Sequence, residues 1–197
     1  MPKLGMEPIR RAALIKATIA EIGRAGSLDV TVSQIARRAG VSSALAHHYF
    51  GAKEQIFLAA MRHILTVFGA QVRTELRGAR GHRSRIEAII TASFDAENFR
   101  PAVIAAWLNF YVQAQTSKDA RRLLRVYQKR LRSNLTHDLR PLVGGRAERV
   151  ADGIGALIDG VYIRQALKDA PLRRDGAIAL VRDYLALELE TTPLATA

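Results

Sequence analysis

The sequence contains no cysteine, which excludes disulfide frameworks, zinc sites built on thiolates and cysteine nucleophiles. Long apolar runs are also missing, because the longest, Ala102–Leu108, is far shorter than a membrane span. The first residues, MPKLGMEPIRR, lack the apolar stretch of a signal peptide. We therefore expect a cytoplasmic protein with no membrane partner.

Proline is scarce, and the stretch from Ile9 to Arg100 has none, so long helices are permitted there. No run alternates between apolar and polar residues with the period of a strand, whereas Ile15, Ile19 and Ile22 recur at helical spacing. We predict an all-α fold of about nine helices. They are expected near 8–25, 32–38, 43–49, 53–77, 82–97, 101–116, 118–139, 146–168 and 174–190.

Acidic residues are few beside basic ones, 18 against 30, and the formal net charge is +12. The excess is concentrated in residues 1–53, with 8 basic and 3 acidic side chains, and in residues 118–149, with 10 and 3. A basic excess indicates a polyanionic partner such as nucleic acid. Charge alone does not say which zone binds it, and a solvated helix face is the alternative for the second zone.

Residues 31–50 read TVSQIARRAGVSSALAHHYF. Thr31 followed three residues later by Gln34 fits a capping box that starts a short helix. Gly40 suits the turn that follows, because glycine adopts positive φ without steric cost, and Ser42 fits the N-cap of a second short helix. This pattern predicts a helix-turn-helix, whose second helix enters the major groove of DNA. An ordinary helical hairpin is the alternative.

The segment IARRAGVSSALAHHYFGAKEQIF resembles the TetR family of transcriptional regulators. Further segments, including SFDAE, AAWLNFY and ALIDGVYIRQAL, resemble the members of that family that control glycine betaine synthesis from choline. The resemblance implies a helix-turn-helix head in residues 1–53 and a ligand-binding and dimerisation domain in residues 54–197. It also implies a homodimeric repressor that binds a palindromic operator in double-stranded DNA and is released by a small effector.

The residues expected to bind DNA fall into two groups, because phosphate contacts give affinity while base contacts give sequence preference. The base-reading candidates include no Arg, Lys, Asn or Gln, so we expect operator shape to contribute much of the specificity. The base-reading candidates are Ser43, Ala44, His47 and His48. The phosphate candidates are Thr31, Arg37, Arg38, Ser42, Tyr49 and Lys53, with Arg10 and Arg11 in addition.

Aromatic residues make up only 6% of the chain, and several of them fall in the second domain. Aromatic side chains in a helical domain first of all form core. If the effector is choline, as the resemblance implies, a cage of aromatic faces with a carboxylate would suit its quaternary ammonium. The cage candidates are Trp107, Tyr111, Tyr127 and Tyr162, supported by Phe94 and Phe110. The acid candidates are Asp95 and Glu97, with Asp159 as the second choice.

The resemblance also implies that the last two helices form the dimer interface. Their apolar stripes are Val150, Ile154, Leu157, Ile158 and Val161 on one helix and Leu180, Val181, Tyr184 and Leu185 on the other. Two-helix pairs of this kind favour a two-fold homodimer, which suits a palindromic operator.

Other functions find less support in the sequence. No phosphate loop, dinucleotide fingerprint or nucleophile elbow is present, and the five histidines lack metal-binding spacing. We therefore predict no enzyme, no metal and no cofactor. Two alternatives stay open: a TetR-type regulator of transport or efflux genes that responds to another lipophilic or cationic ligand, and an architectural helical protein that binds DNA without sequence preference.

Overall fold

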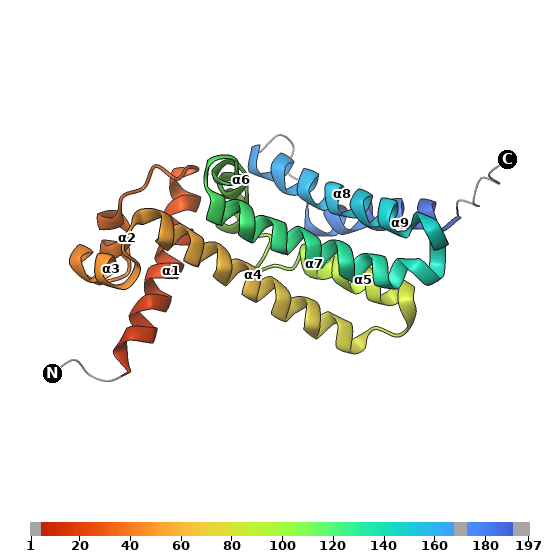
Figure 1. Cartoon of the computed structure of the whole chain (residues 1–197), viewed down its shortest axis with the longest axis horizontal. Helices are drawn as coiled ribbons and strands as arrows, with labels where there is room; N and C mark the ends of the chain where they lie inside the picture. Colours follow the sequence, from red (N-terminus) through yellow and green to blue (C-terminus); the bar gives the residue numbers. More distant parts are fainter. Residues whose placement is uncertain (1–4, 168–172, 191–197) are drawn as a thin grey trace. The chain divides into compact units, whose positions relative to one another are not determined.

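A computed structural model describes residues 5–167 and 173–190, and within these residues the chain forms nine α-helices and one short 3-10 helix, with no strand (Figure 1). The prediction of an all-α fold is confirmed. The helices are α1 (Met6–Ala25), α2 (Val32–Arg38), α3 (Ser43–Phe50), α4 (Lys53–Gly78), α5 (Gly81–Ser93), α6 (Pro101–Thr116), α7 (Lys118–Val143), the 3-10 helix η1 (Gly144–Arg146), α8 (Ala147–Leu167) and α9 (Arg174–Glu190).

The chain packs as two compact units. The first holds the described residues up to Thr66 together with Arg100–Arg122, and the second holds Val67–Phe99 together with the described residues from Leu123 onward. Helices α4 and α7 therefore contribute to both units. The functional boundary predicted after residue 53 concerns what each part binds, and it stays a prediction.

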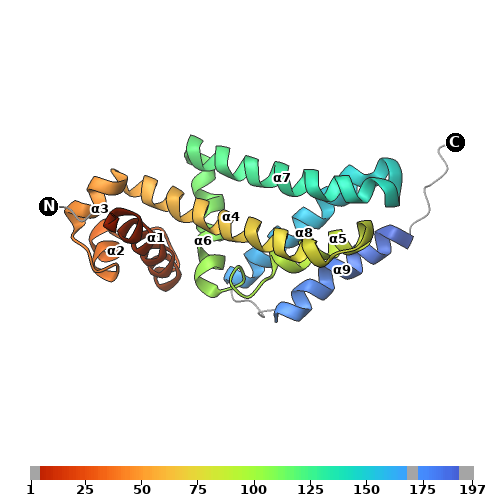
Figure 2. The same ribbon diagram turned by 90° about the horizontal axis from the view of Figure 1, so that it is seen from below.

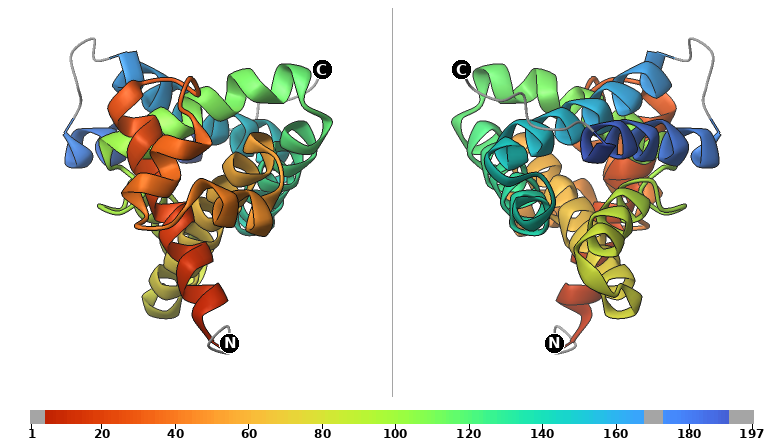
Figure 3. Two further views of the ribbon diagram at one scale, coloured as in Figure 1. Left: turned by 90° about the vertical axis from the view of Figure 1, so that its left-hand side faces the viewer. Right: turned by 90° about the vertical axis from the view of Figure 1, so that its right-hand side faces the viewer.

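The first unit is centred on α1, which packs against α2 and α6 (Figures 1 and 3). Leu14 of α1, Ile35 of α2 and Ile56 of α4 are completely buried. Each buried aliphatic side chain of this size stabilises the folded state by about 1.5–3 kcal/mol. The periodic apolar residues of the sequence thus form the core that holds the head together.

Helices α1 and α6 approach closely at Gly23. A Cβ atom placed on Gly23 would lie 2.5 Å from the Cβ of Ala102 and 2.6 Å from its Cα. The second atom belongs to the backbone, so relieving the clash would require one helix to move. Glycine is needed here for space rather than for an unusual backbone angle.

We expect Gly23→Ala to lower the free energy of unfolding by about 1–3 kcal/mol, because overpacking forces α1 and α6 apart. The control is Gly69→Ala in α4, where a Cβ would meet only the flexible end of Arg73 at 3.5 Å. The free energy of unfolding of that variant should rise by up to about 1 kcal/mol, since alanine has a higher helix propensity than glycine. Urea denaturation followed by circular dichroism measures both, and equal effects of the two substitutions would contradict the close approach.

The second unit has its core where α8 and α9 lie side by side and α5 packs on α9 (Figure 2). Ile86, Ile90, Leu135 and Leu139 are buried there. Most side chains of the two apolar stripes that were predicted to bind a second copy are instead buried within the chain. They are Val150, Ile154, Ile158, Val161, Val181 and Leu185. Their assignment to the dimer interface was therefore wrong. A helix stripe that is apolar by sequence packs first against its own chain.

Two helices end several residues away from the predicted position, while the other predicted ends agree within one residue. The helix expected over 82–97 ends at Ser93, and the next residues form turns in which the Asp95 carboxylate accepts a hydrogen bond from the Glu97 amide at 3.0 Å. The helix expected to end at 139 continues to Val143, past Pro141. Pro141 has no N–H to donate to the carbonyl four residues earlier, so the last turn of α7 forms without that hydrogen bond.

Of the helices in the described residues, α4 alone is long and apolar enough to cross a membrane by length and composition. Its apolar residues have partners in the protein, since Ile56, Leu58, Met61 and Ile64 are buried. A core helix of a folded domain has the same composition, and burial identifies α4 as such a core helix.

Candidate DNA-binding head and candidate ligand site

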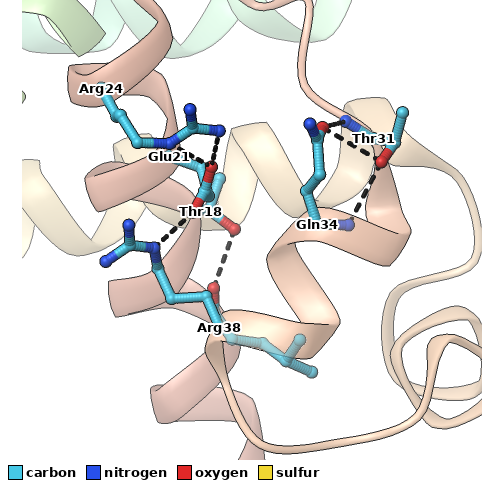
Figure 4. Close-up of polar contacts among 7 residues, drawn as sticks. Thr18, Glu21, Arg24, Thr31, Gln34 and Arg38 are labelled. Atoms are coloured by element: carbon cyan, nitrogen blue, oxygen red, sulfur yellow. Dashed lines mark hydrogen bonds and ion pairs between the residues drawn. The ribbon is translucent and has the colours of Figure 1, made fainter.

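The two short helices of the head are held by the caps that the sequence predicts, and Figure 4 shows the first of them, at Thr31. The Thr31 hydroxyl accepts a hydrogen bond from the Gln34 amide at 3.1 Å, and the Gln34 side chain accepts one from the Thr31 amide at 2.7 Å. The Ser42 hydroxyl accepts from the Leu45 amide at 3.2 Å and caps α3. Gly40, in the turn, has φ of 69°. The predicted helix-turn-helix is therefore present.

The outward face of α3 carries the predicted base-reading residues. Ala44, His47 and His48 are exposed, and Ser43 is half-buried, with its hydroxyl 3.1 Å from that of Ser33. The inward residue is Ala46, which is fully buried. The small size of Ala46 suits a close approach of α3 to the rest of the head.

Several phosphate candidates are placed around α3. Thr31, Arg37 and Ser42 are exposed, while Tyr49 is half-buried. Lys53, the first residue of α4, holds its ammonium 5.5 Å from the centre of the Phe57 ring. A cation at this helix start keeps its apolar stem on the protein and its charge in water.

Arg38 has a partner inside the head. Its guanidinium donates to the carboxylate of Glu21 on α1, and Arg24 donates to the same carboxylate at 2.6 Å (Figure 4). The Glu21 side chain is only 6% exposed. The hydrogen bonds from Arg38 and then from Arg24 hold the pKa of Glu21 below its usual value. This cluster ties α1 to α2, and a phosphate contact by Arg38 stays a prediction.

We expect Glu21→Gln to lower the free energy of unfolding by about 1–2 kcal/mol near neutral pH, because both guanidinium groups lose a buried carboxylate while staying partly hydrated. The pKa of Glu21 is lower in the folded protein than its usual 4.5, so its contribution is present above that value and is lost as pH falls below it. The two proteins should thus converge in stability in acid.

Urea denaturation at about pH 7 and about pH 3.5 measures this convergence. The matched control is Glu54→Gln, which removes an exposed carboxylate from α4 and should change stability little at either pH. A Glu21→Gln deficit that stays constant between the two pH values would contradict the assigned role of the charge.

Arg11 also has partners inside the head. Its guanidinium donates to the backbone carbonyl of Tyr49 at 2.6 Å and lies 4.5 Å from the centre of the Phe50 ring. It therefore caps the carbonyl end of α3, where a positive charge is favourable. Arg11 fixes the recognition helix against α1, and a phosphate contact by Arg11 stays a prediction.

The ligand candidates of α6 form one aromatic group in the first unit. The Trp107 ring stacks on Tyr111 at 5.7 Å between centres and meets Phe110 edge-on at 6.0 Å. Phe110 is almost completely buried, Trp107 is 6% exposed and Tyr111 is half-buried. Their spacing of three and four residues places them on one side of the helix.

A second aromatic group lies in the second unit. Tyr162 stacks on Phe94 at 5.9 Å and meets Phe99 edge-on at 5.7 Å, and its hydroxyl donates to the Ser93 carbonyl at 2.5 Å. Tyr127 is buried in the same unit and meets Phe68 edge-on at 5.8 Å. Each tyrosine therefore offers a ring that is held in place by neighbouring aromatic side chains.

The acid candidates are not equivalent. Burial raises the pKa of both Tyr127 and Tyr162, and the negative charge of Asp159 raises it further in both cases. Asp95 acts on Tyr162 alone, while Glu97 is exposed in the turn after α5. Asp159, the second choice from the sequence, is thus the carboxylate whose charge reaches both buried phenols. No group of three or more His, Asp or Glu side chains suited to a metal ion occurs in the described part of the chain.

Known proteins show the same architecture. Residues 14–60 match the bacterial regulatory proteins of the tetR family, and residues 82–190 match the BetI-type transcriptional repressor C-terminal family. The HTH-type transcriptional regulator BetI of Brucella suis is 54% identical over 197 residues, which cover 99% of both chains. The chain belongs to the TetR family, with a C-terminal region of the BetI type.

Solved structures of TetR-like fold include a transcriptional regulator from Rhodococcus, with a TM-score of 0.82 and 21% identity over 91% of this chain and 96% of that one. Another is a protein from Saccharomonospora viridis crystallised in complex with choline, with a TM-score of 0.77 and 22% identity over 89% and 95% of the two chains. At these identities the likeness shows the fold alone.

Membership of the TetR family makes the chain a DNA-binding transcriptional repressor. The tetR match over residues 14–60 contains the capped helix-turn-helix, and the BetI-type match over residues 82–190 contains both aromatic groups. The predicted family and the predicted function as a DNA-binding repressor are confirmed. Which side chains contact DNA and effector stays a prediction.

Proposed function

We propose that this TetR-family repressor acts in the cytoplasm as a homodimer that binds a palindromic operator and releases it when choline or a related quaternary amine binds. The genes it controls would be those that convert choline to glycine betaine. The observation that carries the proposal is the capped α3 with Ala44 and His47 exposed, in a chain 54% identical over its full length to a BetI regulator.

In the head, α3 would enter the major groove with Ser43, Ala44, His47 and His48 toward the bases. The surrounding phosphate contacts would come from Thr31, Arg37, Arg38, Ser42, Tyr49 and Lys53. Ala44 can contact a thymine methyl, but no side chain of α3 makes the strong bidentate pairs of Arg with guanine or Asn with adenine. Operator shape would therefore supply part of the specificity.

For the effector we propose a site that uses the second aromatic group. A quaternary ammonium has no N–H to donate, so it is bound by aromatic faces and by a nearby negative charge. Tyr127 and Tyr162 supply buried rings, and the charge of Asp159 reaches both. Trp107 and Tyr111 stay candidates from the sequence.

For the dimer interface we propose the apolar side chains of α8 and α9 that are exposed on the single chain. Ile163 is 39% exposed, Leu167 64%, Leu180 45% and Leu187 65%. A two-fold pair would place two heads on half-sites about 34 Å apart, one turn of the duplex. A small movement of α4, which starts three residues after α3 ends, would then change the affinity for the operator.

Linkage gives the proposal a sharp test. If choline weakens operator binding by some factor, operator DNA must weaken choline binding by the same factor. Titrating choline with and without operator, with Trp107 fluorescence as the signal, should show an affinity difference of about 5- to 150-fold. Equal affinities would refute release by choline, and no response to choline, betaine aldehyde or betaine would favour another lipophilic or cationic effector.

Asp159→Asn should weaken choline binding about tenfold and leave the operator affinity without choline unchanged, since it removes only the negative charge beside the two tyrosines. The matched control is Asp152→Asn, which removes an exposed carboxylate from the same helix, where it pairs with Arg132 at 2.7 Å. Choline affinity should stay unchanged in the control. Equal loss in both variants would place the ligand elsewhere.

A further inference from the structure

The imidazole of His47 is held in one orientation by Gly51, at the end of the recognition helix. The Gly51 amide donates to the His47 carbonyl at 2.7 Å, and the His47 Nδ1 lies 2.9 Å from the Gly51 carbonyl oxygen. Gly51 adopts φ of 72°, a backbone conformation that glycine adopts without steric cost. Both bonds join the same two residues, so the ring of this exposed histidine is oriented before any DNA binds.

This contact decides which ring nitrogen carries the proton. A backbone carbonyl can only accept a hydrogen bond, so the His47 Nδ1 must be the donor. In an imidazole with a single proton, the other nitrogen, Nε2, is then an acceptor. His47 therefore presents a hydrogen-bond acceptor, and not a donor, from the exposed side of α3.

We infer that His47 recognises an exocyclic amino group, so that the base it reads is adenine or cytosine. In the major groove only adenine N6 and cytosine N4 donate hydrogen bonds, while guanine N7 and O6 and thymine O4 accept them. An acceptor at Nε2 pairs with the first two bases and repels the acceptors of the other two. This inference rests on the proposed function in one respect, namely that α3 lies in the major groove.

Ala44, on the same face of α3, also favours recognition of adenine. Ala44 lies one helical turn before His47, and both are exposed. The methyl of alanine contacts the thymine methyl, and the thymine of an A·T pair has an adenine amino group beside it. One A·T pair, or two adjacent ones, would therefore satisfy both side chains.

Base analogues test the inference atom by atom. With an operator selected by the full-length protein from a randomised duplex, each adenine is replaced by purine, which lacks the N6 amino group, or by 7-deazaadenine, which keeps it but lacks N7. At the position read by His47, purine should weaken binding about 3- to 10-fold, the effect of one hydrogen bond, and 7-deazaadenine should not. The reverse pattern would overturn the inference.

Substitution identifies the position. His47→Arg replaces the acceptor by donors only, so the preferred base at that position should change from adenine or cytosine to guanine. The matched control, His137→Arg, makes the same exchange at an exposed histidine of α7 and should leave every base preference unchanged. A wild-type preference for guanine or thymine at the position that responds to His47→Arg would overturn the inference.

The protonation of the ring is measured without DNA. Nitrogen NMR of the full-length protein at about pH 8, where a histidine ordinarily has one ring proton, should show His47 protonated at Nδ1, with the signal assigned by its loss in His47→Gln. Protonation at Nε2 alone would overturn the inference. If no operator can be selected, the proposed function fails, and this spectrum still decides the state of His47.

Discussion

Replacing Ala44 by glutamate should lower the affinity for operator DNA about 100-fold or more. Ala44 lies on the exposed face of α3, which would place the new carboxylate in the major groove between two phosphate backbones. Like charges brought together in a binding interface cost several kcal/mol. Because Ala44 is exposed, the free energy of unfolding should change by no more than about 0.5 kcal/mol.

Gel-shift titration measures the affinity, and urea denaturation measures the stability. The control is Ala70→Glu, which adds the same charge at an exposed position of α4 and should retain nearly the full affinity. Substantial retention of operator binding by Ala44→Glu would mean that α3 does not face the DNA.

Replacing Tyr162 by alanine should cost about 3–5 kcal/mol of stability and abolish the response to choline. The ring is 6% exposed and contacts Phe94 and Phe99, so its removal leaves a cavity between aromatic side chains. Tyr162→Phe keeps the ring and removes only the hydroxyl that donates to the Ser93 carbonyl. That variant should lose about 1–2 kcal/mol and still respond to choline.

Thermal and urea denaturation compare the two Tyr162 variants, and Trp107 fluorescence reports the response to choline. The difference between Ala and Phe separates the contribution of the ring from that of the hydroxyl. Equal stability losses would show that the ring is not packed as described, and a full choline response in Tyr162→Ala would exclude Tyr162 from the effector site.

Interactions between residues close together in the chain were enough to predict the helix-turn-helix of the head. The caps at Thr31 and Ser42 involve residues three positions apart, and the turn at Gly40 depends on the backbone of one residue. Interactions this close in the chain are visible in the sequence because they require no knowledge of the fold. For the same reason helical periodicity indicated the nine helices but misplaced the ends at Ser93 and Val143.

Contacts between residues that are far apart in the chain could not be predicted from the sequence. Arg11 and Tyr49 are 38 positions apart, and Glu21 and Arg38 are 17 apart, so nothing local distinguishes these arginines from ones that contact phosphate. Asp159 ranked below Asp95 and Glu97 for the same reason, since only the fold brings its charge near Tyr127 of α7.

The sequence by itself determined that the chain is helical and that it carries a helix-turn-helix, because caps, turns and periodicity act over a few residues, while the TetR family was indicated by the resemblance of its motifs. Tertiary structure decided which apolar side chains of α8 and α9 are buried in the chain's own core and which arginines are already paired. Those outcomes depend on neighbours that folding brings together from far along the chain, and burial and charge pairing act through space.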